Sequence, residues 1–156
     1  MMHAGYRYVI AAIALVVVAV VPGSVAAGSG EHIPGPIPAH VLRVIDGDTL
    51  LARARIWLGQ QVETRVRVAG IDAPEMRGKC PEESGLARRA LALVKATLGD
   101  GEILLHDIRF GKFAGRVVAR VAAKDGGDLA GILIEAGLGR AYRGGKRLPW
   151  CSGEDE

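Results

Sequence analysis

Apolar and polar residues alternate along several stretches of the chain, as they do in strands with one buried and one exposed face. The alternation predicts strands over residues 41–46, 49–51, 62–68, 103–108 and 116–122. Within the third stretch it separates a buried from an exposed face, with Val62, Val66 and Val68 on the first and Glu63, Arg65 and Arg67 on the second. A turn or bulge is predicted at Asp46-Gly47-Asp48, between the first two strands.

Two further stretches have the spacing of amphipathic helices. Glu82–Leu98 has an apolar stripe, begins with acidic residues and is followed by Gly99, as helices typically are. Leu129–Ala136 follows a favourable N-cap residue, Asp128, and precedes Gly137. Five short strands, with a helix after the third and another near the end, predict an α+β, mainly β fold. We expect a five-stranded OB-type Greek-key barrel with two to three helices.

Residues 1–27 are predicted to be a signal peptide. Arg7 precedes an apolar run, Val9–Val21, and small residues follow it. This run of 13 residues is shorter than the ~20 needed to cross a bilayer as a helix. We therefore expect cleavage near Ala26 or Ala27 and a periplasmic or secreted protein, with an uncleaved membrane anchor as the alternative.

Without the predicted leader, the overall charge of the chain gives little information about a polyanionic partner. The leader holds one of the 20 basic residues and none of the 17 acidic ones, so the remaining chain has a net charge of only +2. The glycine- and proline-rich residues 28–38 are predicted to be a linker, and residues 152–156 an acidic tail. A basic cluster precedes that tail and is interpreted as solvated surface unless it borders a site; its members are Arg140, Arg143, Lys146 and Arg147.

The chain contains two cysteines, Cys80 and Cys151. An exported protein meets an oxidising compartment, so a disulfide between them is predicted, with two free thiols as the alternative. Two cysteines without paired histidines do not make a zinc site.

Carboxylates gather in two short motifs. Asp46 and Asp48 belong to the predicted turn, while Asp72 and Glu75 flank Ala73-Pro74. A site with oxygen ligands alone suits Ca²⁺, which takes 6–8 oxygens in proteins. The alternative is two separate turns with solvated acids.

Two arginines favour a common site over two separate turns with solvated acids. Arg67 precedes the second acidic motif, and Arg116 follows Gly115. Guanidinium groups match the phosphoryl oxygens that gain negative charge when a phosphodiester is cleaved. Arg65 shares a strand face with Arg67, so the alternation does not choose between them. Acids and arginines together predict a site that holds a metal ion and a phosphodiester at once.

The order of the motifs Ile45–Thr49, Arg67–Glu75 and Gly115-Arg116, with a helix before the last, resembles the staphylococcal nuclease (thermonuclease) family. The resemblance covers roughly Ala39–Tyr142 and implies a nuclease domain over residues 39–151.

By this resemblance Asp48, Asp72 and the backbone carbonyl of Ala73 are expected to bind Ca²⁺, with Asp46 as a supporting acid. The catalytic residues implied are Arg67, Glu75 and Arg116, which favours Arg67 over Arg65. Glu75 is expected to act as general base, and both arginines to stabilise the transition state.

The function implied is Ca²⁺-dependent hydrolysis of DNA and/or RNA by an exported monomer that contacts a membrane only if its leader is uncleaved. A non-catalytic OB-fold module that binds nucleic acid, or an enzyme for another phosphodiester, are the alternatives. The founding member of the family has threonine at Ala73, tyrosine at Ala114 and an acid at Lys112. The last two departures bear on substrate contacts.

Overall fold

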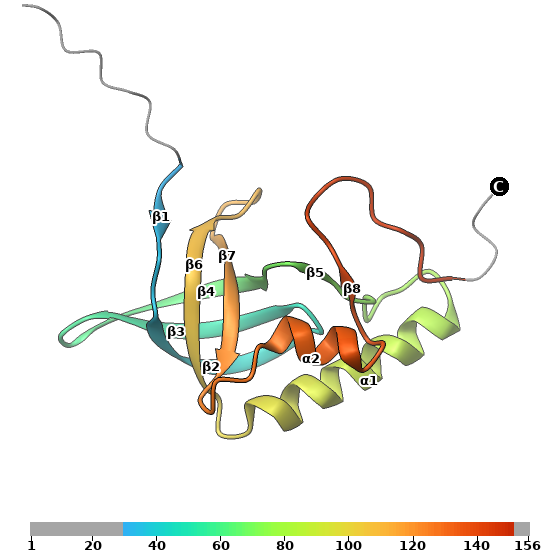
Figure 1. Cartoon of the computed structure of the whole chain (residues 1–156), viewed down its shortest axis with the longest axis horizontal. Helices are drawn as coiled ribbons and strands as arrows, with labels where there is room; N and C mark the ends of the chain where they lie inside the picture. The colour runs from blue at the N-terminus through green and yellow to red at the C-terminus, as the bar shows by residue number, and fades with distance from the viewer. Residues whose placement is uncertain (1–29, 152–156) are drawn as a thin grey trace, which may run out of the picture.

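Five long strands pair side by side in a closed ring, which forms a barrel (Figure 1). In the computed structural model, which describes residues 30–151, these strands are β2 (Ile37–Asp46), β3 (Thr49–Trp57), β4 (Gln60–Val68), β6 (Glu102–Phe110) and β7 (Arg116–Ala123). All pairings are antiparallel except β4–β7, which is parallel. The mixed barrel confirms the predicted OB-type α+β fold. The predicted leader (1–27) and acidic tail (152–156) lie outside the described residues.

The barrel interior is filled by the apolar positions of the alternating pattern. Leu50, Val66, Val68 and Leu105 are at most 1% exposed. Burying such side chains is the main favourable contribution to folding, about 1.5–3 kcal/mol for each large one. The 62–68 alternation is therefore confirmed at its barrel end.

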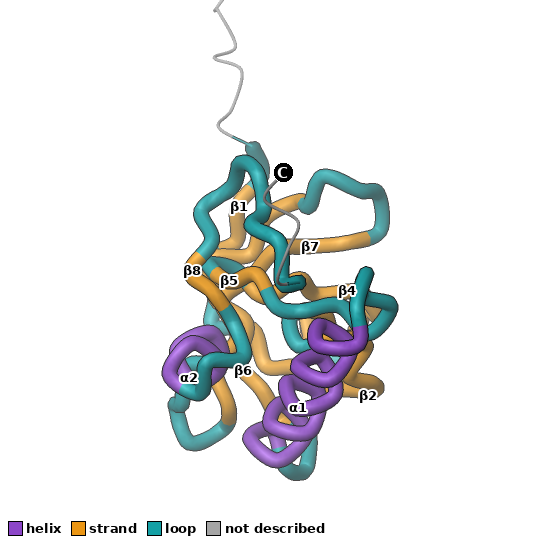
Figure 2. The backbone as a smooth tube through the Cα atoms, turned by 90° about the vertical axis from the view of Figure 1, so that its right-hand side faces the viewer, coloured by secondary structure: helices purple, strands orange, loops and turns teal. Residues whose placement is uncertain are grey.

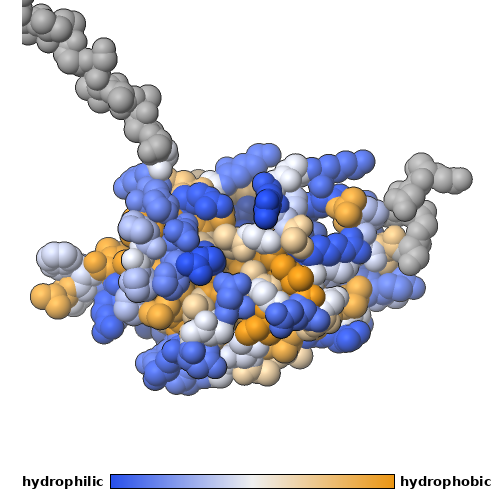
Figure 3. Space-filling model, viewed as in Figure 1, coloured by the Kyte–Doolittle hydropathy of each residue, from blue (hydrophilic) through white to orange (hydrophobic). Residues whose placement is uncertain are grey.

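At its other end the same pattern is wrong, because the β3–β4 hairpin runs past the barrel. Val62, predicted to be buried, is 44% exposed. The tip residues Ile56, Trp57 and Leu58 are 51%, 73% and 89% exposed, and the hydrophobic colour at the far end of the hairpin shows this tip in Figure 3. Alternation indicates strand geometry but not where the covering layer ends.

Two helices, α1 (Pro81–Leu98) and α2 (Leu129–Glu135), lie on one side of the barrel (Figure 2). Both match their predicted positions. The Cys80 side chain caps α1 and the Asp128 side chain caps α2 by accepting backbone N–H bonds. Ala90 and Val94 of α1 are fully buried against the core. Within residues 30–151, no helix has the length and apolar character needed to span a bilayer.

Three two-residue strands were not predicted. β1 (His32–Ile33) pairs with β6, and β2 already begins at Ile37, so the interval 28–38 contains strand residues where we expected a linker. Pairing with β6 supplies backbone partners that a glycine- and proline-rich pattern does not reveal. β5 (Ile71–Asp72) pairs with β8 (Arg140–Ala141), which brings the end of the chain beside Asp72.

Candidate functional site

The acidic motifs meet where the β2–β3 turn packs against the segment after β5. Asp46, Gly47 and Asp48 form the turn, and the Val68 N–H donates to the Asp48 carbonyl at 2.8 Å, which ties the turn to the end of β4. A Cβ on Gly47 would lie 2.9 Å from the Cβ of Ala90 and 3.0 Å from that of Ala73. Glycine at this position therefore lets the turn approach both α1 and the Ala73 segment.

Arg67 links the two motifs. Its Nη1 forms an ion pair with Asp48 Oδ1, and its Nη2 lies 3.7 Å from Asp72 Oδ1 and donates to the Ile71 carbonyl at 3.2 Å. Both aspartates are 4% exposed, and the Arg67 side chain is 13% exposed. Arg65, on the same face of β4, is exposed. Arg67, assigned to the exposed face from the alternation, thus lies between two buried carboxylates.

Asp48 also holds the loop that carries the second motif. Its Oδ2 accepts the Ala73 N–H at 3.0 Å, and its Oδ1 accepts the Thr49 hydroxyl at 2.9 Å. Removing one partner from a buried ion pair costs roughly 3–5 kcal/mol, because the other charge stays buried. Substitutions of Arg67 or Asp48 therefore test folding as well as chemistry.

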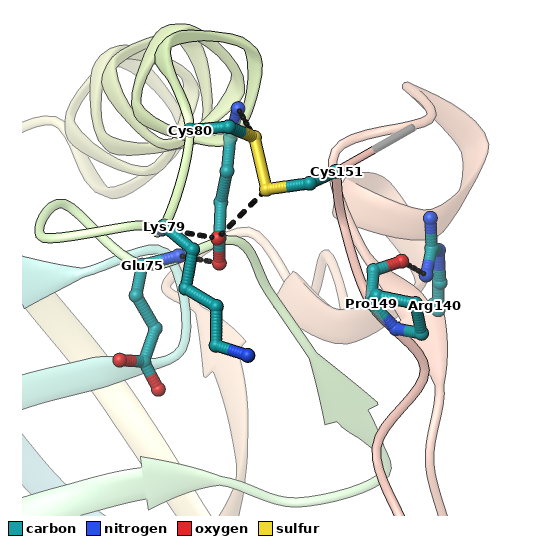
Figure 4. The surroundings of a disulfide bond; sticks show 7 residues. Glu75, Lys79, Cys80, Arg140, Pro149 and Cys151 are labelled. Atoms are coloured by element: carbon teal, nitrogen blue, oxygen red, sulfur yellow. Dashed lines mark hydrogen bonds between the residues drawn. A yellow bond between two sulfur atoms is a disulfide. The ribbon is translucent and has the colours of Figure 1, made fainter. Parts of the chain in front are cut away.

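Glu75 is positioned through its backbone by the start of α1. The buried Glu83 carboxylate accepts the Glu75 N–H at 3.2 Å and the Lys79 N–H at 2.9 Å. The predicted disulfide between Cys80 and Cys151 is confirmed and lies beside Glu83. Figure 4 shows the Glu75 carboxylate extending away from the disulfide.

The end of the chain contributes contacts that sequence reasoning missed. Arg147 Nε lies 3.1 Å from Asp72 Oδ1, and its Nη1 donates to Glu75 Oε1 at 2.9 Å. The Trp150 indole N–H donates to Asp72 Oδ2 at 3.2 Å. The basic cluster in the sequence was the available signal, and Arg147 meets the exception stated for it, because this residue lies beside Asp72 and Glu75.

Burial acts to lower the pKa of the Arg147 guanidinium, but attraction to Asp72, Asp48 and Glu75 outweighs it and raises the pKa. Arg147 therefore stays charged at any physiological pH. A cleft of about 460 Å³ is lined by Asp72 and Glu75 from the acidic loop and by Arg147 and Trp150 from the segment after β8.

Arg116 is not joined to these contacts, and Asp46 reaches the second motif through one backbone hydrogen bond. Arg116 begins β7 opposite Arg65 of β4, and its guanidinium lies 4.7 Å from the Phe113 ring centroid. Its buried Nε has no hydrogen-bond partner, and in the described part of the chain it makes no ion pair with a carboxylate. Asp46 Oδ1 accepts the Met76 N–H at 3.4 Å.

The donor chemistry fits a hard divalent cation. Asp48 and Asp72 offer carboxylate oxygens, and the buried Asp72 Oδ1 accepts no well-aligned hydrogen bond despite its two arginine neighbours. Among residues 30–151, the only cluster of three or more potential ligands is Cys80, Glu83 and Cys151. Its sulfurs are joined in the disulfide, so it does not support a calcium site.

The fold defines the class of protein as an OB-type α+β barrel. Its candidate site contains an arginine, Arg67, between two buried aspartates. Comparison of the chain with protein-family models and with curated proteins found no match.

Proposed function

We propose that this chain is an exported, Ca²⁺-dependent nuclease of the staphylococcal nuclease type that hydrolyses phosphodiester bonds of DNA and/or RNA as a monomer. The observation that carries the proposal is the arrangement of Arg67 between Asp48 and Asp72. The segment that follows Asp72 is held to Asp48 and continues to Glu75. A buried acidic pair and a forked guanidinium match the two needs of phosphodiester cleavage, a cation site and a phosphate ligand. The export part rests on the sequence of residues 1–27.

Asp48, Asp72 and the carbonyl of Ala73 are the residues that would hold the ion, with Asp46 in support. When bound, Ca²⁺ supplies positive charge that stabilises the negative charge developing on the phosphoryl oxygens.

The side chains of this chain do the remaining chemistry. The Glu75 carboxylate accepts a proton from the attacking water, a general-base contribution of typically 10²–10⁴-fold. The water oxygen forms a new bond to phosphorus, one ester P–O bond breaks, and the departing alkoxide takes a proton from solvent. Arg67 and Arg116 donate hydrogen bonds to the phosphoryl oxygens, which gain charge in the transition state. The Arg116 guanidinium lies 4.7 Å from the Phe113 ring centroid, and stacking on a ring leaves the in-plane N–H groups of an arginine available to donate.

A second candidate function is binding of single-stranded nucleic acid without cleavage. Phe110 and Phe113 are 72% and 61% exposed, and Arg116 stacks on Phe113. Exposed aromatic rings beside arginine are typical of surfaces on which bases stack.

Cleavage of single-stranded DNA and RNA, measured with Ca²⁺ and with a chelator, tests the proposal. The Glu75→Gln variant keeps the size and backbone of the residue and is expected to cut about 10²–10⁴-fold more slowly. Arg116→Ala is expected to cut more slowly as well. Glu63→Gln is the matched control, because Glu63 pairs with Arg53 on the outer hairpin.

Cutting that persists in chelator would discard the calcium assignment. Retention of nucleic acid on the protein without cutting, in any divalent ion, would favour the binding module instead. Equal activity of the Glu75→Gln and Glu63→Gln variants would refute the role of Glu75.

A further inference from the structure

The segment after β8, residues 142–151, forms an arch over the candidate site and is called here the C-terminal strap (Figure 1). Both of its ends are held. The Tyr142 N–H donates to the Gly70 carbonyl at 2.9 Å beside the β5–β8 pair, and Cys151 is bonded to Cys80. Gly144 and Gly145 have φ of 101° and 95°, which lets the strap turn back at its middle.

Between these anchors the strap touches both oxygens of the Asp72 carboxylate. Arg147 Nε lies 3.1 Å from Oδ1, and the Trp150 indole N–H donates to Oδ2 at 3.2 Å. The second arm of the Arg147 guanidinium reaches Glu75. The strap therefore places a cationic side chain on the carboxylates that the proposed function needs for a metal ion and for a general base.

A divalent cation on Asp72 and the guanidinium of Arg147 compete for one place. A Ca²⁺ ion lies about 2.3–2.6 Å from each oxygen ligand. If it bound Asp72 Oδ1 while Arg147 stayed 3.1 Å from that oxygen, the two positive charges would be no more than about 6 Å apart. At this distance, in a partly buried site, like charges repel strongly.

We propose that Arg147 sets the affinity of the site for its divalent cation, because docking of the strap on Asp72 weakens binding of the cation to the same carboxylate. The inference rests on the proposed function, since it takes Asp72 as a cation ligand. Arg147 is a positioning residue in this account: it acts on the cation through Asp72 and on the general base through Glu75.

The strap itself offers the matched control. Lys146 precedes Arg147, carries the same charge and is exposed, and it forms no ion pair with another residue in the range 30–151. Removing either side chain lowers the net charge equally, so a general charge effect predicts equal changes in cation affinity. Competition for Asp72 predicts a change for Arg147 alone.

Calorimetric titration of the disulfide-intact protein with Ca²⁺ tests the proposal. Arg147→Met is expected to bind Ca²⁺ about tenfold or more tightly than the unsubstituted protein, and Lys146→Met less than about threefold more tightly. Arg147→Lys keeps the charge but loses the forked guanidinium group, and its Ca²⁺ affinity is expected between those of the unsubstituted protein and Arg147→Met. In a Trp57→Phe background, Trp150 is the remaining tryptophan of the described chain, and its emission is expected to change as Ca²⁺ binds and the strap leaves Asp72.

Equal Ca²⁺ affinities of Arg147→Met and Lys146→Met would overturn the inference, and so would the absence of Ca²⁺ binding by every variant. The first result leaves the proposed cleavage standing, whereas the second also removes its dependence on Ca²⁺. Cleavage itself is read separately on nucleic acid. Conversely, the expected order of affinities in a protein that does not cut would support the competition and refute the nuclease.

Discussion

Breaking the disulfide is expected to destabilise the protein by an amount that the length of its loop determines. Cys80 and Cys151 are 71 residues apart, and the loop contains α1, β6, β7, α2 and β8. In the chain-entropy model, closing a loop of this length removes conformational freedom from the unfolded chain worth about 4 kcal/mol at 25 °C. We therefore expect Cys151→Ala to lower the free energy of unfolding by about 4 kcal/mol.

Urea unfolding followed by circular dichroism measures this change. The slope of the free energy against urea should rise at the same time, because an unfolded chain without the cross-link exposes more surface. The unsubstituted protein in reductant is the control for the substitution itself. Cys80→Ala should lose slightly more than Cys151→Ala, because the Cys80 sulfur also accepts the Glu83 N–H at 3.4 Å at the start of α1.

A loss below about 1 kcal/mol with an unchanged urea slope would refute this reasoning. It would mean that the unfolded chain is already as compact without the cross-link as with it. Agreement between reductant and Cys151→Ala, at about 4 kcal/mol, would assign the effect to the covalent link.

Three further predictions follow from packing, capping and charge. Leu50→Ala removes a fully buried side chain from the barrel and should cost about 2–5 kcal/mol in urea unfolding, whereas Leu58→Ala, at the exposed hairpin tip, should change stability by less than about 0.5 kcal/mol. Asp128→Ala removes the α2 cap and should cost about 1 kcal/mol; an Asn substitution that is equally harmful would contradict a capping role. The hydrogen bond from Arg120 lowers the pKa of Asp107 despite slight desolvation. The contribution of this exposed pair to folding stability should therefore be present above the usual aspartate pKa and be lost as the pH falls through the lowered pKa of Asp107. NMR titration of Arg120→Met should show that the pKa of Asp107 rises back toward its usual value.

The barrel was predictable because its strands carry alternation and its helices carry caps. Val66 and Val68 are buried and Asp128 caps α2, as expected from residue type and spacing alone. Val62 was misassigned because the period of two persists in a hairpin after the barrel ends.

The site was only partly predictable, because its assembly depends on pairings too short to leave a pattern. The β5–β8 ladder has two residues in each strand, yet it brings the strap to Asp72. Its consequence, the contacts of Arg147 and Trp150 with Asp72, cannot be read from local sequence. The placement of Arg67 between Asp48 and Asp72 likewise follows from tertiary packing, since alternation treats it like Arg65.

The parallel pairing of β4 with β7 determines when Arg65 and Arg67 come close to Arg116 during folding. Arg65 pairs with Arg116, 51 positions later, and the intervening chain must be brought back before this ladder forms. Pairings of such long sequence separation raise the contact order and slow folding, often to milliseconds or seconds. A nascent chain that ends before residue 116 can form the β2–β4 meander but not the closed barrel. The strand carrying Arg67 and the strand carrying Arg116 therefore join only after β7 has been synthesised.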